Sequence, residues 1–170
     1  MEQNIENKLD FKTKIINFYH NNKIKFLCLL FILIIITILK IFVDIKTKKE
    51  NTNISEKYIK AGVYLTSNDK KNAAKLYEEI ILSKNKFYSL LSINALIEKN
   101  LIDENEKILN YFDIIENINY TEEKLDLISF KKALFLIKKS KDKEGKKILK
   151  NLIEKESKYK FLAEEIIINK

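Results

Sequence analysis

The sequence predicts an all-α protein in which one N-terminal transmembrane helix precedes a solenoid of helical hairpins. Three observations predict this fold class. Residues 26–43, FLCLLFILIIITILKIFV, contain a single charged residue, Lys40. The chain has two Gly and no Pro, so the strongest helix breakers are nearly absent. Small and aromatic residues also recur at intervals of 34 residues after the apolar segment, as a repeated helical unit requires.

Residues 26–43 predict a helix that crosses a bilayer once. Hydrocarbon offers no hydrogen-bond partner to a peptide group, so a segment that enters it must be helical. A rise of 1.5 Å per residue makes this segment about 27 Å long, close to the hydrocarbon thickness. Lys40 lies near one end, where its apolar stem can reach back to the headgroups. Cys28, the only cysteine, lies inside the span, where its expected role is that of a small hydrophobe.

A cleaved signal peptide is the nearest alternative to a permanent anchor. Its apolar region is typically about 7–15 residues long and precedes a small-residue cleavage site. Here no small residue follows the span until Thr47, and the leader over residues 1–25 carries three acidic side chains. An uncleaved signal anchor therefore fits better. Lysines are nearly balanced across the span, and a slight excess before it favours a cytoplasmic N-terminus.

The chain divides into four predicted segments: a leader over 1–25, the transmembrane helix over 26–43, a polar linker over 44–53 and a helical domain over 54–170. Within that domain, apolar spacings of three and four predict seven amphipathic helices. They are expected at 54–66, 70–83, 87–100, 103–117, 121–139, 142–156 and 159–169. Asp103 and Glu106 predict a capping box at the start of one helix. Asn68 is expected in a left-handed conformation at a turn.

Composition argues against catalysis and against nucleic-acid binding. All 32 basic residues are Lys, and the net charge of +8 lacks the arginines typical of a nucleic-acid surface. His20 and Cys28 are the only residues of their types, so neither a disulfide nor a thiolate metal cluster can form within the chain. No phosphate-binding loop or hydrolase motif occurs. The sequence therefore predicts a non-enzymatic protein without a cofactor or a bound metal.

The repeat is carried by small residues followed by aromatic or leucine residues. Ala61 and Ala95 are 34 residues apart, as are Tyr77 and Tyr111, and Ala133 follows Ala95 after 38, which predicts a four-residue loop insertion. Small residues let two antiparallel helices approach closely, and the larger residue fills the adjacent space. The predicted packing positions are Ala61, Tyr64, Ala73, Tyr77, Ala95, Tyr111, Ala133, Gly145 and Leu149.

This pattern resembles the tetratricopeptide repeat, which has the same period of 34 residues. Lys107 replaces an expected small residue, and the closing Pro of the family is missing. Together with the anchor, the pattern resembles the ancillary SecYEG translocon subunit family. Local likenesses are the sequences KIINFYH over residues 14–20 and FYSLLSINALI over residues 87–97.

The resemblance implies a single-pass protein of the bacterial inner membrane, with a cytoplasmic N-terminus and a periplasmic repeat domain. It also implies protein partners, namely SecYEG and a periplasmic folding factor, and a role in protein folding or trafficking. The alternatives are a scaffold for cell division or envelope assembly, and a membrane regulator whose cytoplasmic helical domain binds an acidic protein or nucleic acid.

In a repeat stack, the first helix of each pair lines the face that binds a partner. The predicted partner face consists of Tyr58, Leu65, Tyr88, Leu91, Asn94, Phe130, Lys131 and Leu134. The alternative is that its aromatic residues belong to the core. Residues 131–160 hold twelve lysines against four acids, a net charge of +8, whereas residues 103–126 hold eight acids against two lysines, a net charge of −6. The basic region can attract the acidic region within the fold, or receive an acidic partner or anionic headgroups.

Overall fold

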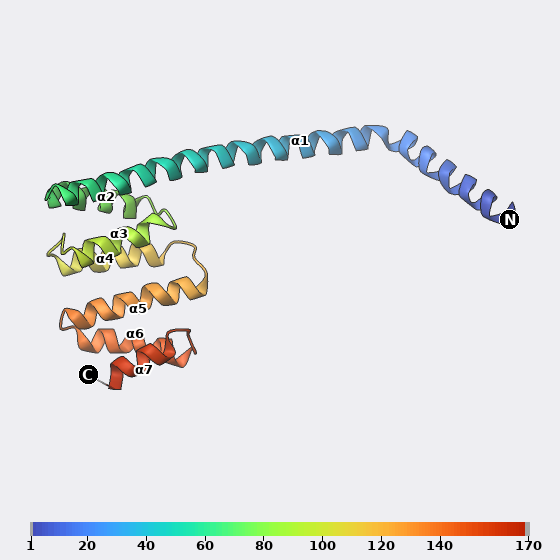
Figure 1. Ribbon diagram of the computed structural model, residues 1–170. Coiled ribbons are helices and arrows are strands. Elements are labelled where there is room, and N and C mark those ends of the chain that lie inside the picture. Colours follow the sequence, from blue (N-terminus) through green and yellow to red (C-terminus); the bar gives the residue numbers. More distant parts are fainter. Residues whose placement is uncertain (1, 169–170) are drawn as a thin grey trace. The chain divides into compact units, whose positions relative to one another are not determined.

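The protein is described from a computed structural model over residues 2–168; side chains are described from residue 12 onward, except that of residue 15. These residues form seven helices and no strand (Figure 1). The helices are α1 (Glu2–Thr66), α2 (Lys70–Leu82), α3 (Tyr88–Glu98), α4 (Asn105–Glu116), α5 (Glu122–Lys138), α6 (Asp142–Glu154) and α7 (Lys160–Ile168). The all-α prediction is confirmed. Residue 169, the expected end of the last helix, lies outside the described residues.

The chain separates into two compact units between Glu50 and Asn51. The first unit holds the N-terminal part of α1, and the second holds the end of α1 together with α2–α7. The sequence predicts a polar linker over 44–53 and a new helix from Ile54, whereas α1 continues through both. Residues 44–53 contain neither Gly nor Pro, so nothing in them forces the helix to end.

The most apolar part of α1 is not covered by protein. Every large apolar side chain from Phe26 to Val43 is exposed. The one polar hydroxyl in this stretch is satisfied within the helix, because Thr37 Oγ1 donates a hydrogen bond to the Leu33 carbonyl at 2.8 Å. Among the described helices, α1 is the one long and apolar enough to span a membrane.

Helix ends in the second unit share one backbone feature. The residue that follows the C-terminal cap of five helices has a positive φ, between 46° and 60°: Asn68, Lys84, Asn100, Ser140 and Glu156. After α1, the Asp69 N–H reaches back to the Tyr64 carbonyl at 2.8 Å, which satisfies a carbonyl that the helix leaves open. The left-handed conformation expected of Asn68 is confirmed, with φ of 59°.

The N-terminal caps differ from the sequence prediction. The predicted capping box is wrong: α4 begins at Asn105, and its cap residue Glu104 makes no side-chain hydrogen bond to the helix. Asp103 therefore lies one residue too early to act as the cap. A side-chain cap does occur on α2, where Asp69 accepts a hydrogen bond from the Asn72 N–H at 3.1 Å.

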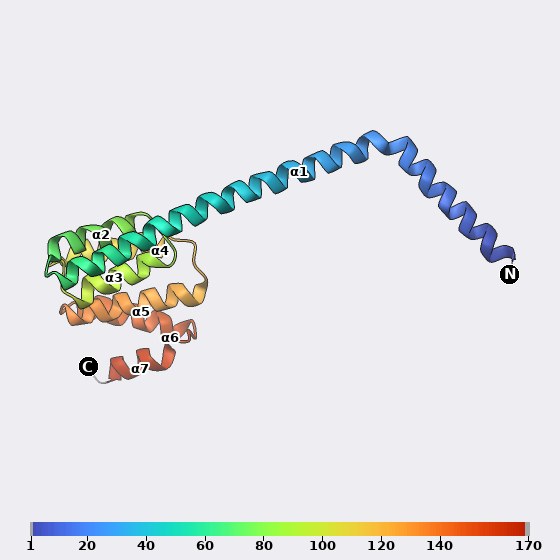
Figure 2. The same ribbon diagram turned by 45° about the horizontal axis from the view of Figure 1, so that its top comes forward.

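The helices of the second unit pack in chain order, α2 on α3 through to α6 on α7 (Figures 1 and 2). Their buried residues form two apolar clusters. The larger extends from α1 to α5 around Phe112, which has no exposed surface. The smaller joins α5, α6 and α7 around Leu149. Helix α5 belongs to both, with Phe135 in the larger cluster and Phe130 in the smaller.

Candidate functional site

The predicted packing positions lie mostly in the interior of the second unit. Those with no exposed surface are Ala61, Ala73, Ala133 and Leu149. Those nearly or fully enclosed are Tyr77, Tyr111 and Gly145, whereas Tyr64 and Ala95 are half-buried.

Gly145 lies at a close approach of α5 and α6. A Cβ atom placed on it would lie 2.8 Å from the Ala133 carbonyl oxygen and 2.6 Å from Ile137 Cγ1. The two helices can therefore touch here only because residue 145 has no side chain. A Cβ atom placed on Gly62, in contrast, would meet no other atom within 4 Å.

The aromatic residues of the predicted partner face belong largely to the packed layers. Tyr58 contacts Tyr77 and Tyr88, each with a ring-centroid distance of 5.5 Å. Burial raises the pKa of the Tyr58 hydroxyl, and Glu98 and Tyr88 raise it further. Phe130 is 9% exposed and stacks on a tyrosine of the α6–α7 joint, so its ring lies in the core. Leu65 and Leu91 are half-buried.

Three other residues of that predicted face meet in a groove between α3 and α5, which we call the inner groove. Asn94 comes from α3, and Lys131 and Leu134 come from α5. The groove has a volume of about 170 Å³. Its remaining lining is Ile97, Glu98, Phe135 and Lys138.

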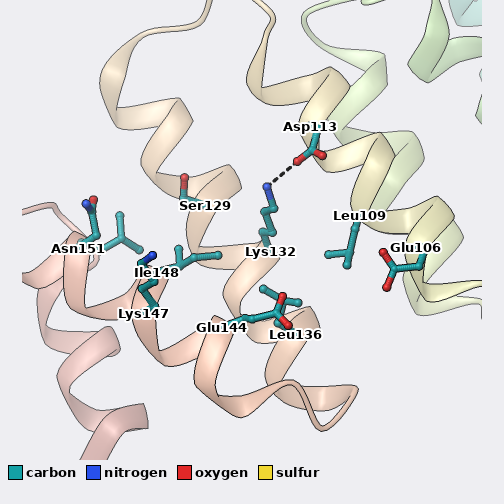
Figure 3. A pocket seen from close by; sticks show the side chains of 11 residues that line it. Glu106, Leu109, Asp113, Ser129, Lys132, Leu136, Glu144, Lys147, Ile148 and Asn151 are labelled. Carbon is teal, nitrogen blue, oxygen red and sulfur yellow. Dashed lines mark hydrogen bonds and ion pairs between the residues drawn. The ribbon is translucent and has the colours of Figure 1, made fainter.

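A second groove, which the sequence did not indicate, lies between α4 and α6 with α5 beneath it; we call it the outer groove (Figure 3). Its volume is about 590 Å³. Leu109, Leu136 and Ile148 point into it from three different helices (Figure 3). The expected loop insertion before the third hairpin is wrong: the joint between α4 and α5 is no longer than that between α2 and α3, and the extra residues lie within α5, which has 17 residues against 11 in α3.

Ion pairs neutralise much of the charge around the outer groove. Lys132 Nζ lies 2.7 Å from Asp113 Oδ1 and 2.8 Å from Glu116 Oε2 (Figure 3 shows the first pair). Burial alone would lower the pKa of Lys132, but the hydrogen bonds to both carboxylates outweigh it and leave the pKa raised. Lys141 binds Glu106 in the same way, at 2.6 Å. Of the two lysines that line this groove, Lys132 is thus occupied by acids of α4, whereas Lys147 has no carboxylate within ion-pair distance among the described residues.

The inner groove has a different electrostatic character. Lys131 and Lys138 line it, and neither has a carboxylate within ion-pair distance among the described residues. Its floor is formed by aliphatic and aromatic side chains. Within residues 12–168 no cluster of three potential metal ligands occurs. An apolar floor with uncommitted cations suits binding of a macromolecular segment.

Comparisons of the chain with family models, curated proteins and solved structures find no match. The apolar span and the grooves of the helical unit therefore carry the functional interpretation.

Proposed function

We propose that this chain is a non-enzymatic, membrane-tethered adaptor whose helical unit binds a protein partner through the inner groove. The observation that carries the proposal is the meeting of Asn94, Lys131 and Leu134 in one groove, on a chain whose first helix can span a membrane. Interaction sites of proteins combine an apolar centre with a polar rim, and this groove has both.

The proposed architecture is a tetratricopeptide-like solenoid. Its hairpins are the end of α1 with α2, α3 with α4, and α5 with α6, and α7 follows alone. The close approach at Gly145 and the burial of Ala61, Ala73 and Ala133 support this arrangement. In it, α3 and α5 are first helices of their pairs, so a groove between them lies on the side where such stacks bind their partners.

The proposed partner is the Sec translocon, as the resemblance to its ancillary subunits implies. The first segment of the chain is then cytoplasmic, α1 crosses the inner membrane, and the helical unit lies in the periplasm, where it assists folding or trafficking of emerging proteins. Tethering raises the local concentration of the helical unit near a membrane partner, so even weak contacts produce useful occupancy.

Affinity purification of the tagged full chain from membranes in mild detergent tests the partner. Translocon subunits should be recovered with the chain, and fewer of them with a Leu134→Glu variant, because the groove floor would then carry a charge. A Lys143→Glu variant on α6, outside both grooves, should recover as much as the unmodified chain. Recovery of division or envelope-assembly proteins alone would support the scaffold alternative instead.

Topology tests the proposed location of the helical unit. Alkaline phosphatase fused after Lys170 should be active, because this enzyme folds in the periplasm. Activity of a cytoplasmic reporter at the same position, with an inactive phosphatase fusion, would instead support a membrane regulator with a cytoplasmic helical domain.

A further inference from the structure

We propose that the inner groove binds an acidic peptide segment in which two carboxylates flank one apolar side chain. The inference rests on the proposed function, because it names the class of partner segment that the same groove receives. It is carried by the two uncommitted lysines, the apolar floor between them and the amide on the facing helix.

The first observation is the difference between neighbouring lysines on α5. Lys132 projects toward the outer groove and is bound by two carboxylates of α4. Lys131 and Lys138 line the inner groove, and no carboxylate in the described chain lies within ion-pair distance of either. The fold thus neutralises one lysine of this helix and leaves the two in the groove available to an external anion.

The second observation is the apolar surface between these two lysines. Leu134 is 39% exposed, although it lies in the middle of a packed helix, and Phe135 forms the floor beside it. Ile97 completes this floor from α3. Along α5 the groove therefore presents a cation, an apolar surface and a second cation.

The opposite wall is polar and suits a peptide backbone. Asn94 is half-buried, and its side chain has no hydrogen-bond partner within the described part of the chain. An amide both donates and accepts, so it can bind the N–H and C=O of one extended residue. Glu98 lies on the same wall, where it would repel a carboxylate. Carboxylates of the ligand are thus directed to the α5 side.

The spacing of the lysines defines the spacing of the acids. Lys131 and Lys138 are seven residues apart on α5, which corresponds to about 10 Å along the helix. An extended peptide advances about 3.4 Å per residue, so two carboxylates three positions apart match this separation. The ligand pattern is therefore acidic, two residues of which one is large and apolar, then acidic.

A fluorescein-labelled peptide of sequence GDALDG tests the inference, with the full chain held in nanodiscs of zwitterionic lipid. Binding is measured by fluorescence anisotropy at low salt. The double variant Lys131→Glu with Lys138→Glu should weaken binding at least about tenfold, since both cations become anions. The GNALNG and GKALKG peptides should bind at least about tenfold more weakly than GDALDG.

The matched control is the double variant Lys143→Glu with Lys150→Glu on α6. Both lysines are exposed, lack carboxylate partners among the described residues and have the same spacing of seven. The net charge changes equally, so this variant should bind GDALDG within about twofold of the unmodified chain. Helical circular dichroism of all variants confirms that they fold.

Equal loss in both double variants would overturn the inference, because binding would then follow net charge rather than the groove. Equal affinity for the neutral GNALNG peptide or for a random single-stranded oligonucleotide would also overturn it. The proposed function can fail separately. Binding of GDALDG with the expected variant pattern, combined with no recovery of translocon subunits, leaves the peptide preference standing and removes the translocon as partner.

Discussion

Substitution of the two glycines by alanine should change stability in opposite directions. Both residues lie inside helices, Gly62 in α1 and Gly145 in α6. Alanine lowers the conformational entropy of the unfolded chain and favours the helix by about 1 kcal/mol at either position. The atoms around each position determine the rest of the change in stability. A methyl group at residue 62 meets nothing within 4 Å, whereas at residue 145 it meets two atoms closer than 3.0 Å.

The contact at residue 145 is costly because one of the two atoms is a backbone carbonyl oxygen, of Ala133. Ile137 can change its rotamer, but the carbonyl moves only if α5 and α6 separate. Overpacking of this kind costs about 1–3 kcal/mol, and the rigid neighbour places this site toward the upper limit. With the gain in helix propensity included, Gly145→Ala should lower the free energy of unfolding by about 1–2 kcal/mol. Gly62→Ala should raise it by about 0.5–1 kcal/mol.

Urea denaturation of the full chain in detergent micelles, followed by near-ultraviolet circular dichroism, measures both changes. Seven of the eight tyrosines lie in the second unit, so the signal reports on that unit. In thermal denaturation, Gly62→Ala should raise Tm by about 3 °C, and Gly145→Ala should lower it by about 4–8 °C. A Gly145→Ala variant as stable as Gly62→Ala would refute the close contact between α5 and α6.

Three further predictions concern helix ends, the core and acid stability. Lys84→Gly and Glu156→Gly should each stabilise the unit by about 0.5–1 kcal/mol in urea denaturation, because both residues have positive φ, 56° and 54°, where a Cβ is unfavourable. Phe112→Ala should destabilise it by about 3–5 kcal/mol in the same assay, since the ring is fully buried. Hydrogen bonds from the side chain and backbone of Asn72 lower the pKa of Asp69, so the folded state favours the ionised carboxylate. Stability should therefore fall as the pH drops from the ordinary value of 3.8 toward the lower folded pKa, and Asp69→Asn should flatten this acid dependence.

Most helices could be located from the sequence because their apolar spacing is regular and few breakers interrupt it. The segment predicted at 70–83 is Lys70–Leu82, and that predicted at 142–156 is Asp142–Glu154. The polar segment 44–53 was harder to interpret, since its polarity suggested a linker although every residue in it tolerates a helix. Polarity alone does not distinguish a solvated helix from a loop.

The grooves depend on long-range contacts that periodicity does not encode. Lys131 and Lys132 are adjacent and chemically identical, yet α4 supplies two carboxylates to the second and none to the first. Asp113 and Glu116 reach Lys132 only because of how α4 packs on α5. A sequence pattern can assign residues to a face of a helix, but the partners of each charge depend on where the neighbouring helix lies.

The division of the core into two clusters has a consequence for how the unit opens. Helices α6 and α7 are held by the smaller cluster, so they can separate from the unit while the cluster around Phe112 stays closed. Amide protons of α6 and α7 should then exchange with solvent faster than those of α4. Because α5 belongs to both clusters, its C-terminal half stays ordered by Phe135 when its contacts with α6 are lost. The end of the chain farthest in sequence from the apolar span can thus unfold and refold while the rest of the unit remains folded.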